Sequence, residues 1–390
     1  MIARIFIYLL LVIVLPDLYA YRHWLRRRTD LPSWLRWLWW LPGSVLTIYT
    51  IVLAAQPDFA PDNIVWLNIY LFLFGLTAAP KFIFVFFSLC GRLLKHWLGW
   101  RRNWGNYAGL IAATGILYVL LRGTMADIDD LKIRHIDITV ASLPEAFDGY
   151  RIVQFSDAHI GSLPEHLLSR AVDSINAQQG DIVVFTGDLV NKSAKEIDRY
   201  QPTLASIHAT DGVYSILGNH DYSMYIKATD TEKRANEQQL QQKEREMGWH
   251  LLLNEHEIIR RGTDSLVIAG EENNGGKRFP HRGDLGRTLQ GINTTAFIVM
   301  LQHDPADWRK SILPHSHAQL TLSGHTHGGQ ISLFGIRPTQ LSGSEDLGLY
   351  REGQRWLYVS AGLGGYVPFR YGVTPEIAVI TLHKQQTKQK

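Results

Sequence analysis

The sequence predicts a chain of two parts: a bundle of membrane-spanning helices, followed by an α/β domain in which helices cover a largely buried sheet. Up to about Met125 the chain is rich in Leu, Ile, Trp and Phe, and its charges are confined to short clusters. From Asp127 onward charged residues, glycines and histidines are spread throughout, as in a soluble domain. There, short β-type runs alternate with helical segments. We therefore expect two domains, 1–125 and 126–390.

Length and composition narrow the choice of function. The 390 residues are too many for one small core. The overall 46% of apolar and 19% of charged residues conceal the division between the two parts. The net charge of +3 is too small to indicate a nucleic-acid partner, and no long basic run stands out. The single cysteine, Cys90, excludes an intrachain disulfide and says nothing about the redox compartment.

Four apolar stretches in the first part can each cross, or nearly cross, a hydrocarbon core of about 30 Å at roughly 1.5 Å per residue. They are about Ile5–Tyr21, Trp37–Ala55, Ile64–Cys90 and Tyr107–Leu121. Tryptophans crowd their ends, as at membrane interfaces. The alternative is a set of buried helices in a soluble domain. The first stretch lacks the small-x-small cleavage site of a signal peptide. The third is long enough to tilt, or to break at Pro80 and Lys81.

The connections between these stretches predict the orientation. The first connection contains five arginines and the third contains four basic residues, whereas residues 56–63 contain two aspartates and no Lys or Arg. The positive-inside rule therefore places the first and third connections in the cytoplasm. We expect an integral protein of the inner or plasma membrane whose large C-terminal domain is extracytoplasmic. Arg122, just after the fourth stretch, opposes this assignment weakly.

In the second part we expect ten strands and three helices. The strands are Ile133–Val140, Tyr150–Phe155, Ile182–Phe185, Gly212–Ile216, His250–Leu253, Ser265–Ala269, Ala296–Leu301, Ala318–Thr321, Trp356–Val359 and Ile377–Thr381. The helices are Leu163–Ala177, Ala194–Ile207 and Thr231–Met247. The last of these is polar along most of its length, so we expect it to be solvated.

Polar residues follow five of these strands directly. They lie in the segments Ser156–His159, Thr186–Asn191, Gly218–Asp221, Gln302–Pro305 and Gly324–Gln330. In open α/β sheets the ligand crevice lies at the carboxyl ends of the strands, so these Asp, Asn and His side chains can converge. Any one segment alone is weak evidence for a site, because a single loop histidine is usually solvated or caps a helix. Five such segments in succession indicate a shared site.

The residue types in these segments suit two metal ions about 3.5–4 Å apart, which need a shared anionic bridge and separate ligands on each side. Asp188 is the natural bridge. Asp157 and His159 can chelate one ion together, His325 and His327 can point one to each ion, and Asn219 and His303 complete the second set. Mixed carboxylate, amide and imidazole ligation favours Mn, Fe or Zn over Ca²⁺. A structural zinc site is disfavoured, because it closes at four ligands and normally uses thiolates.

The series SDAHIG, TGDLVN, LGNHD, QHDP and SGHTHGG resembles the metal signature of the calcineurin-like metallophosphoesterase superfamily, without a missing ligand. The resemblance covers the chain from about Ile133 to the C-terminus, and the preceding spans resemble the superfamily's transmembrane branch. It implies a β-sandwich flanked by helices, a binuclear metal centre and attack on phosphorus by a metal-bound hydroxide. Some relatives of this type act on lipid-linked diphosphates such as UDP-diacylglucosamine.

Carried over to this sequence, the resemblance assigns residues to two metal ions. Those of the first ion are Asp157, His159, Asp188 and His327, and those of the second are Asp188, Asn219, His303 and His325. The resemblance also implies that His220 protonates the leaving oxygen or stabilises the transition state, and that Asp221 orients His220. Arg370 is either a ligand for a substrate phosphate or an ordinary surface arginine. Asn191 lies beside a ligand loop, and turn formation explains it equally well.

The resulting hypothesis is a membrane-anchored, metal-dependent hydrolase of a phosphodiester, diphosphate or phosphomonoester, including lipid-linked ones. Membrane tethering favours a lipid-linked substrate, because an active site held near a bilayer meets amphiphiles at high effective concentration. The alternative is a non-catalytic, metal-dependent membrane sensor or scaffold, against which His220 argues. A nuclease is less attractive, because a basic groove is lacking. A transporter is disfavoured because the spans contain few ionisable groups, with Lys81 the main exception.

Overall fold

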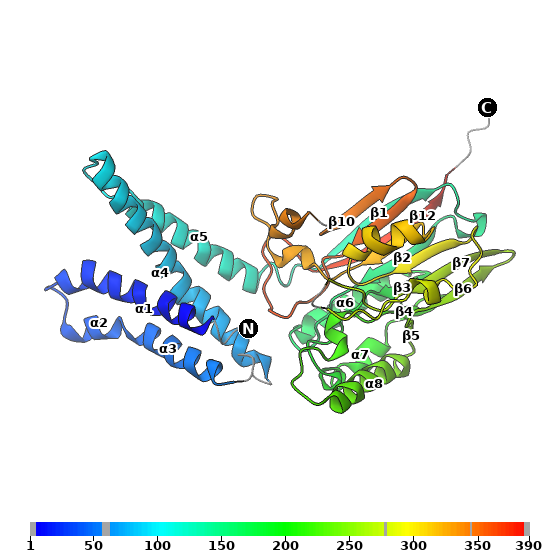
Figure 1. Cartoon of the computed structure of the whole chain (residues 1–390), viewed down its shortest axis with the longest axis horizontal. Coiled ribbons are helices and arrows are strands. Elements are labelled where there is room, and N and C mark those ends of the chain that lie inside the picture. The colour runs from blue at the N-terminus through cyan, green and yellow to red at the C-terminus, as the bar shows by residue number, and fades with distance from the viewer. Residues whose placement is uncertain (1–4, 57–62, 277–278, 344, 386–390) are drawn as a thin grey trace. The chain divides into compact units, whose positions relative to one another are not determined.

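The structure is a computed structural model that describes residues 5–56, 63–276, 279–343 and 345–385. The chain divides into two compact units, Met1–Met125 and Ala126–Lys390. We call them the membrane unit and the sandwich unit and describe each by itself. The helices and strands of both can be followed along the chain in Figure 1.

The membrane unit contains helices α1 to α5. Their bounds are Phe6–His23 (α1), Ser33–Leu38 (α2), Leu41–Ala54 (α3), Ile64–Leu98 (α4) and Gly105–Met125 (α5). Among the described residues, four helical segments are long and apolar enough to cross a bilayer: Phe6–Arg27, Ser33–Ala54, Ile64–Leu98 and Gly105–Met125. The second span thus begins earlier than expected, and α3 itself starts at Leu41, where Pro42 occupies the first turn.

The break considered at Pro80 does not occur, because α4 continues through it for 35 residues. Proline is tolerated in membrane helices, where neighbouring groups compensate for the missing donor. The side chain of Asn63, just before α4, accepts the backbone N–H of Val65, and Gly99, just after the helix, adopts the left-handed conformation. Helices α4 and α5 approach closely at Gly91 and Gly105. A Cβ atom on Gly105 would lie 2.1 Å from the carbonyl oxygen of Phe87, so only glycine fits there.

The described residues of the sandwich unit form two six-stranded sheets, ordered β1-β12-β2-β3-β4-β5 and β10-β11-β9-β8-β7-β6. The strands of the first sheet are Lys132–Val140 (β1), Tyr150–Phe155 (β2), Ile182–Phe185 (β3), Val213–Ser215 (β4), His250–Leu251 (β5) and Glu376–Lys384 (β12). Those of the second are Glu255–Arg261 (β6), Asp264–Gly270 (β7), Phe297–Leu301 (β8), Leu320–Ser323 (β9), Gly348–Glu352 (β10) and Arg355–Val359 (β11).

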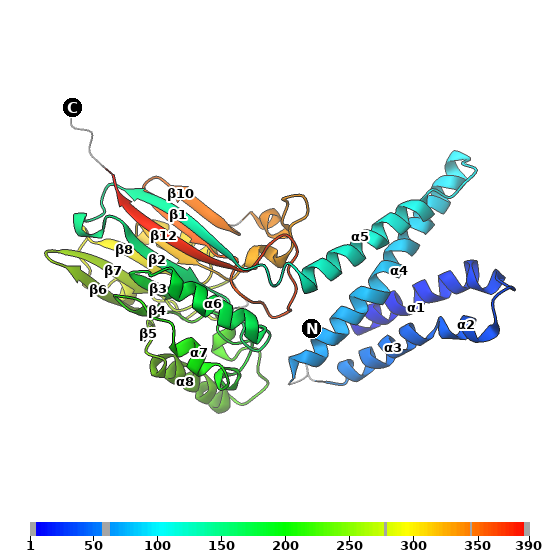
Figure 2. The ribbon, with the colours of Figure 1, turned by 180° about the vertical axis from the view of Figure 1, so that it is seen from behind.

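The two sheets pack face to face around one apolar core, to which Ile152 and Val184 contribute from the first sheet and Leu266 and Val299 from the second. Helices α6 (Glu165–Ala177), α7 (Gln201–Ala205) and α8 (Asp230–Glu246) cover the outer face of the first sheet, as Figure 2 shows. The turn Trp308–Ile312 packs on the outer face of the second sheet. The expected β-sandwich flanked by helices is therefore confirmed.

Strands β2, β3 and β4 pair in parallel, as do β7, β8 and β9. The carboxyl ends of each parallel set therefore meet at one edge of its sheet. Two strands were not expected: β6, with sequence EHEIIRR, and β10, with sequence GLYRE. They form the two opposite edges of the second sheet, where polar side chains replace the apolar alternation that marks a buried strand.

The expected helix over 194–207 is wrong. A short 3₁₀ turn, Ala194–Ile197, is followed by the five-residue α7, because Pro202 starts a new helix and cannot continue an existing one. Helix α8 is solvated as expected, except for a stripe in which Leu240 and Glu244 are fully buried. The hydroxyl of Ser215 on β4 donates to one carboxyl oxygen of Glu244 at 2.6 Å. The other oxygen has no hydrogen-bond partner among the described residues.

Burial raises the pKa of Glu244 to about 8, against 4.5 for a free glutamate, and the Asp221 carboxylate adds to the rise. The folded state therefore binds this proton more tightly than the unfolded chain. The resulting stability is fully present below about pH 4.5 and is lost as the pH rises to about 8. One pKa unit is worth about 1.4 kcal/mol, and about 1 kcal/mol shifts the melting temperature of a domain of this size by roughly 2–4 °C.

We predict that Glu244→Gln, which cannot titrate, raises the melting temperature by several degrees more at pH 8 than at pH 5. The measurement is thermal unfolding of the full-length protein in detergent, at one fixed metal concentration. The control is Glu246→Gln, an exposed site on the same helix, which should behave alike at both pH values. An equal effect of Glu244→Gln at both pH values contradicts the prediction.

Candidate metal centre

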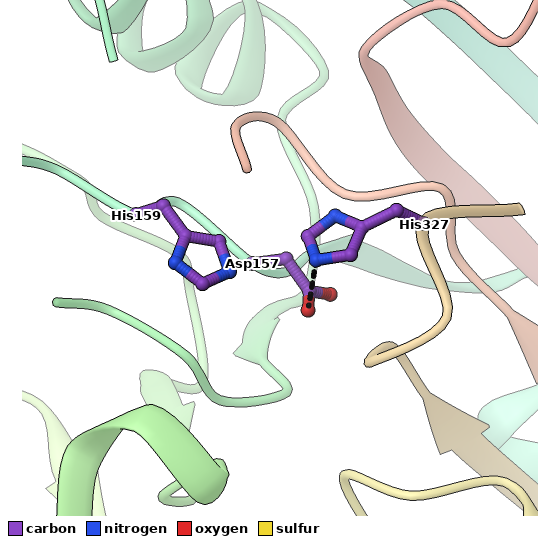
Figure 3. A group of neighbouring side chains, drawn as sticks. All are labelled: Asp157, His159 and His327. Carbon is purple, nitrogen blue, oxygen red and sulfur yellow. Dashed lines mark ion pairs between the residues drawn. The ribbon is translucent and has the colours of Figure 1, made fainter. Parts of the chain in front are cut away.

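The seven predicted metal ligands lie together where strands of both sheets end. Asp157 and His159 follow β2, Asp188 follows β3 and Asn219 follows β4; His303 follows β8, and His325 and His327 follow β9. Among the described residues, three groups have ligand atoms within 4.8 Å of one another: Asp157–His159–His327, His159–Asp188–His220 and Asp188–His303–His325. Figure 3 shows the first group, whose three side chains point toward one another.

The carboxylate of Asp188 lies between the other ligands. Its Oδ2 atom is 3.6 Å from Nε2 of His159 and 3.3 Å from Nε2 of His303. Its Oδ1 atom accepts the backbone N–H of His220 at 2.8 Å, which fixes the orientation of the carboxylate. One oxygen of a single carboxylate therefore faces both groups of ligands, the geometry that a bridging ligand requires.

The first group has an acceptor atom without a donor. Nδ1 of His159 donates to Oδ1 of Asn191 at 3.0 Å, so the lone pair of this imidazole is on Nε2. Nε2 is buried and has no hydrogen-bond partner among the described residues. Nε2 of His327 lies 3.5 Å from Oδ1 of Asp157, the ion pair dashed in Figure 3. A buried nitrogen lone pair beside two carboxylates fits a divalent cation.

The second group is arranged in the same way. Nδ1 of His303 donates to the carbonyl oxygen of Thr186 at 2.7 Å, which turns Nε2 toward Oδ1 of Asn219 at 3.2 Å and toward Asp188. The amide of Asn219 donates to the hydroxyl of Tyr225 at 3.1 Å, so its oxygen is directed at the site. These acceptor atoms would repel one another unless a positive charge lies between them.

Burial and negative charge act in opposite directions on the pKa values of the four candidate imidazole ligands. Burial lowers the pKa of His303, but the neighbouring Asp188 carboxylate outweighs it and raises that pKa to about 10. Burial, with a smaller effect of His220, lowers the pKa of His159 to about 3. Burial also lowers the pKa of His325 and His327. Three of the four imidazoles are therefore held in the neutral form that binds metals, and the fourth has a proton where a cation would fit.

Five of the seven predicted ligands have a backbone conformation that is uncommon for residues other than glycine. Their φ angles are 50° for Asp157, 45° for His159, 61° for Asp188, 72° for His325 and 51° for His327. Such residues cost of order 1–3 kcal/mol each and persist only where the surrounding structure holds them. The ligand loops are therefore preorganised by the fold.

Asp221 does not orient His220, so that expectation is wrong. Among the described residues, its carboxylate accepts the backbone N–H groups of Asp188, Leu189, Val190 and Gly218 at 2.8–3.2 Å. The tight turn Asn219–Tyr222 points this side chain back toward its own start. Burial and then the Asp188 carboxylate raise the pKa of Asp221 to about 7, against the effect of these backbone donors. Asp221 therefore fixes the loop that carries the bridging residue.

His220 is positioned by other groups. Its Nδ1 donates to the carbonyl oxygen of Asn191 at 2.8 Å, and the ring of Tyr225 stacks on it with the centroids 4.2 Å apart. The His220 ring is partly exposed, and its centre lies 5.8 Å from the centre of the Tyr366 ring on another loop. Because Nδ1 is occupied, Nε2 is the nitrogen that remains to hold or transfer a proton.

Arg370 is not an ordinary surface arginine, because only 1% of it is exposed. Its guanidinium donates to the carbonyl oxygens of Ala361 and Gly364. Burial lowers its pKa to about 10. In the loop that Arg370 holds, the backbone N–H of Gly364 donates to the carbonyl oxygen of Asp157 at 2.8 Å. Arg370 thus supports the backbone of a ligand loop, and its contact with a substrate phosphate stays a prediction.

Asn191 does more than turn formation explains. Its side chain orients His159, its carbonyl oxygen orients His220, and its amide nitrogen donates to the hydroxyl of Ser162 at 2.7 Å. One residue therefore positions a metal ligand and the neighbouring candidate acid. A signal was available, since Asn191 follows Asp188 by three residues in the same loop. Tyr225 and the carbonyl of Thr186 carried no such signal in the sequence.

We predict that Asn191→Ala weakens metal binding about 10–100-fold, as is typical for the partner of a ligating histidine. Asn191→Asp retains an acceptor for Nδ1 of His159 and should restore most of the affinity. The measurement is calorimetric titration of the metal-free, full-length protein with Mn²⁺. Equal Mn²⁺ affinities for the wild type and Asn191→Ala would show that the hydrogen bond between His159 and Asn191 does not contribute to metal binding.

Two family models match the chain. Residues 3–127 match the model described as a probable calcineurin-like phosphoesterase, transmembrane domain, and residues 150–329 match that of the calcineurin-like phosphoesterases. The phosphopantetheinyl hydrolase PptH of Mycobacterium tuberculosis is a similar solved structure at 12% identity, with a TM-score of 0.35, over 58% of this chain and 96% of that one.

Curated relatives agree with the models. The uncharacterized metallophosphoesterase YkuE of Bacillus subtilis is 32% identical over 62% of this chain and 81% of that protein. The UDP-2,3-diacylglucosamine pyrophosphatase LpxG of Chlamydia trachomatis is 30% identical over 61% of this chain and 86% of that protein. A transmembrane protein with a metallophosphoesterase domain from Danio rerio is 30% identical over 64% of this chain, which spans 57% of that relative. The chain belongs to the calcineurin-like metallophosphoesterase family of hydrolases and carries that family's transmembrane domain.

Proposed function

We propose that this protein is a membrane-anchored phosphoesterase with two divalent metal ions, of the Mn, Fe or Zn type, in the site around Asp188. Residues 1–125 form its membrane domain and residues 126–390 its catalytic domain. Asp157, His159 and His327 hold one ion; Asn219, His303 and His325 hold the other, and Asp188 bridges them. The observation that carries the proposal is the single carboxylate oxygen of Asp188 that faces imidazoles of both groups.

Two such ions, when bound, neutralise charge on phosphoryl oxygens and lower the pKa of a bound water. The side chains around them supply the remaining functions. Nε2 of His220 is the atom that would give a proton to the leaving oxygen, because Nδ1–H donates to the carbonyl oxygen of Asn191. Tyr225 packs against one face of His220 and keeps the imidazole in place. Asp221 keeps the loop of Asp188 in position through backbone donors.

We propose that the substrate is a phosphodiester, diphosphate or phosphomonoester attached to a lipid. Two observations support this class. The membrane domain holds the site close to amphiphiles, which raises their effective concentration. The relative LpxG is named for the hydrolysis of UDP-2,3-diacylglucosamine, a lipid-linked diphosphate.

The protein is an integral membrane protein, and we propose that its catalytic domain is extracytoplasmic in an inner or plasma membrane. The basic first and third connections support this orientation. We predict that an alkaline phosphatase fused after Lys390, a reporter active only outside the cytoplasm, is active, whereas the same reporter fused after Arg102 is inactive. Activity of the second fusion alone would place the catalytic domain in the cytoplasm.

We predict that the purified full-length protein hydrolyses a chromogenic phosphodiester, a phosphomonoester or UDP-2,3-diacylglucosamine in the presence of Mn²⁺, and that a chelator abolishes turnover. Asp188→Asn should eliminate activity and reduce the metal content measured by mass spectrometry. His220→Gln should lower kcat about 10²–10⁴-fold, the usual share of general acid catalysis, with the metal content unchanged.

The matched control is His208→Gln, an exposed histidine outside the ligand loops, which should leave kcat unchanged. Loss of metal from His220→Gln would make His220 a ligand and not an acid. Failure of a metal-loaded wild type on all these substrates and on a panel of lipid phosphates would favour the alternative, a metal-dependent sensor or scaffold.

A further inference from the structure

We propose that the membrane unit binds one molecule of an anionic glycerophospholipid. Its phosphate accepts hydrogen bonds from the ammonium group of Lys81, and its two acyl chains occupy two cavities on either side of that residue. The proposal concerns Pro80 and Lys81, which stand out in the sequence and have no part in the phosphoesterase site. It depends on the membrane unit alone.

The first cavity lies between α1, α4 and α5 and has a volume of about 320 Å³. Its walls are apolar and aromatic; Ala20, Trp24, Phe84 and Ala113 contribute, and Lys81 is the charged residue among them. The volume lies within the range of small-molecule sites, about 300–1,000 Å³. Because these helices span the bilayer, the molecules available to fill such a space are lipids.

The second cavity has a volume of about 310 Å³ and lies beside the first connection. Leu35, Leu38 and Pro42 line it, together with three residues that also line the first cavity, Leu25, Trp39 and Lys81. The two cavities are therefore neighbours that share one wall. A lipid with two chains joined at a phosphate-bearing headgroup matches two apolar cavities that meet at one cation.

Lys81 faces these cavities, whereas its counterion does not. Its Nζ atom lies 2.7 Å from Oδ1 of Asp17, yet 24% of the Lys81 side chain is exposed and only 3% of that of Asp17. The ammonium group also lies 4.8 Å from the centre of the Trp39 ring. An ammonium group has three donors, and Asp17 is its hydrogen-bond acceptor among the described residues. In a bilayer unused donors are costly, and a lipid phosphate can satisfy them.

The surroundings favour an anionic lipid. The Lys81–Asp17 pair is neutral as a unit, so selectivity must come from other charges. The connection that contains Leu25 and Leu35, which line the cavities, also contains the exposed Arg26, Arg27 and Arg28 and the half-buried Arg36. Basic clusters beside a membrane span attract anionic lipids, by about 1 kcal/mol per residue. If the ion pair only held α1 and α4 together, the pair itself would be explained, but the two cavities that meet at Lys81 would not.

The test is native mass spectrometry of the full-length protein in detergent, titrated with phosphatidylglycerol or with phosphatidylcholine of identical chains. We expect the wild type to retain one phosphatidylglycerol about tenfold more tightly than phosphatidylcholine, which corresponds to about 1.4 kcal/mol and so to the attraction of one or two of these arginines for the net negative charge of the lipid. Ala113→Leu narrows the first cavity and leaves the ion pair intact, so it should weaken retention. The paired substitution Asp17→Asn with Lys81→Gln removes the phosphate donor without leaving a lone buried charge, and it should weaken retention of both lipids. The combined substitution of Arg26, Arg27 and Arg28 by Gln should abolish the preference for phosphatidylglycerol.

The matched controls are Ala108→Leu, at an exposed position on α5, and Lys95→Gln, at an exposed position on α4. Both should retain the lipid as the wild type does. Circular dichroism and gel filtration of each variant distinguish loss of the lipid from loss of the fold. Equal retention of the two lipids by the wild type, or unchanged retention of phosphatidylglycerol by a folded Ala113→Leu protein, would overturn the proposal and leave the ion pair as a clamp.

Discussion

The site depends above all on the position of one carboxylate, that of Asp188. It follows β3 in the middle of the first sheet, and its Oδ2 atom lies within 3.6 Å of imidazoles from both sheets. His159 comes from the first sheet and His303 from the second, so the two groups of ligands meet only because the sheets pack face to face. The carboxylate of Asp221 accepts the backbone N–H of Asp188, and the backbone N–H of His220 donates to Oδ1 of Asp188. The Oδ2 atom of Asp188 is therefore left directed at the other ligands. The fold thus concentrates negative charge at a point where a positive charge lowers the free energy.

This arrangement has a conformational cost that the apolar core must offset. Five ligands adopt a left-handed backbone, and their combined cost, at about 1–3 kcal/mol each, is of the same order as the net stability of a domain. Burial of Asp157 and Asp188 adds to it. The ligand loops follow strands β2, β3, β4, β8 and β9, whose side chains are buried along most of their length. Rigid strand ends can hold strained loops, whereas flexible ones would relax. The geometry is therefore present before any ion binds.

Much of this could be predicted from the sequence, because the signals are local. A run such as Ile182–Phe185 is apolar throughout, as a parallel strand buried on both faces requires, and the polar residue after it marks the strand end. Apart from the helix expected over 194–207, where Pro202 is a local signal, the failures are non-local. Asp221 is adjacent to His220 in sequence, but its carboxylate turns toward the loop of Asp188. Arg370 is charged, yet it is buried by carbonyl groups that the sequence does not place near it. The edge strand β6 has too many charged residues to resemble a strand, because its pairing depends on β7 and not on burial.

Buried charge in the two units obeys the same physics. In the sandwich unit carboxylates remain buried because imidazoles and backbone N–H groups surround them. In the membrane unit Asp17 is buried against α3, where Gly43 leaves room for its carboxylate, and Lys81 faces it from α4. Neutral hydroxyl pairs join helices elsewhere in this unit: Thr50 contacts Tyr70 at 2.9 Å, and Tyr19 contacts Ser88 at 2.8 Å. Since such pairs hold membrane helices together without the desolvation cost of charge, an ion pair is not needed for packing alone. What distinguishes Lys81 from those clamps is a cation that is directed at apolar space, where an anionic amphiphile fits.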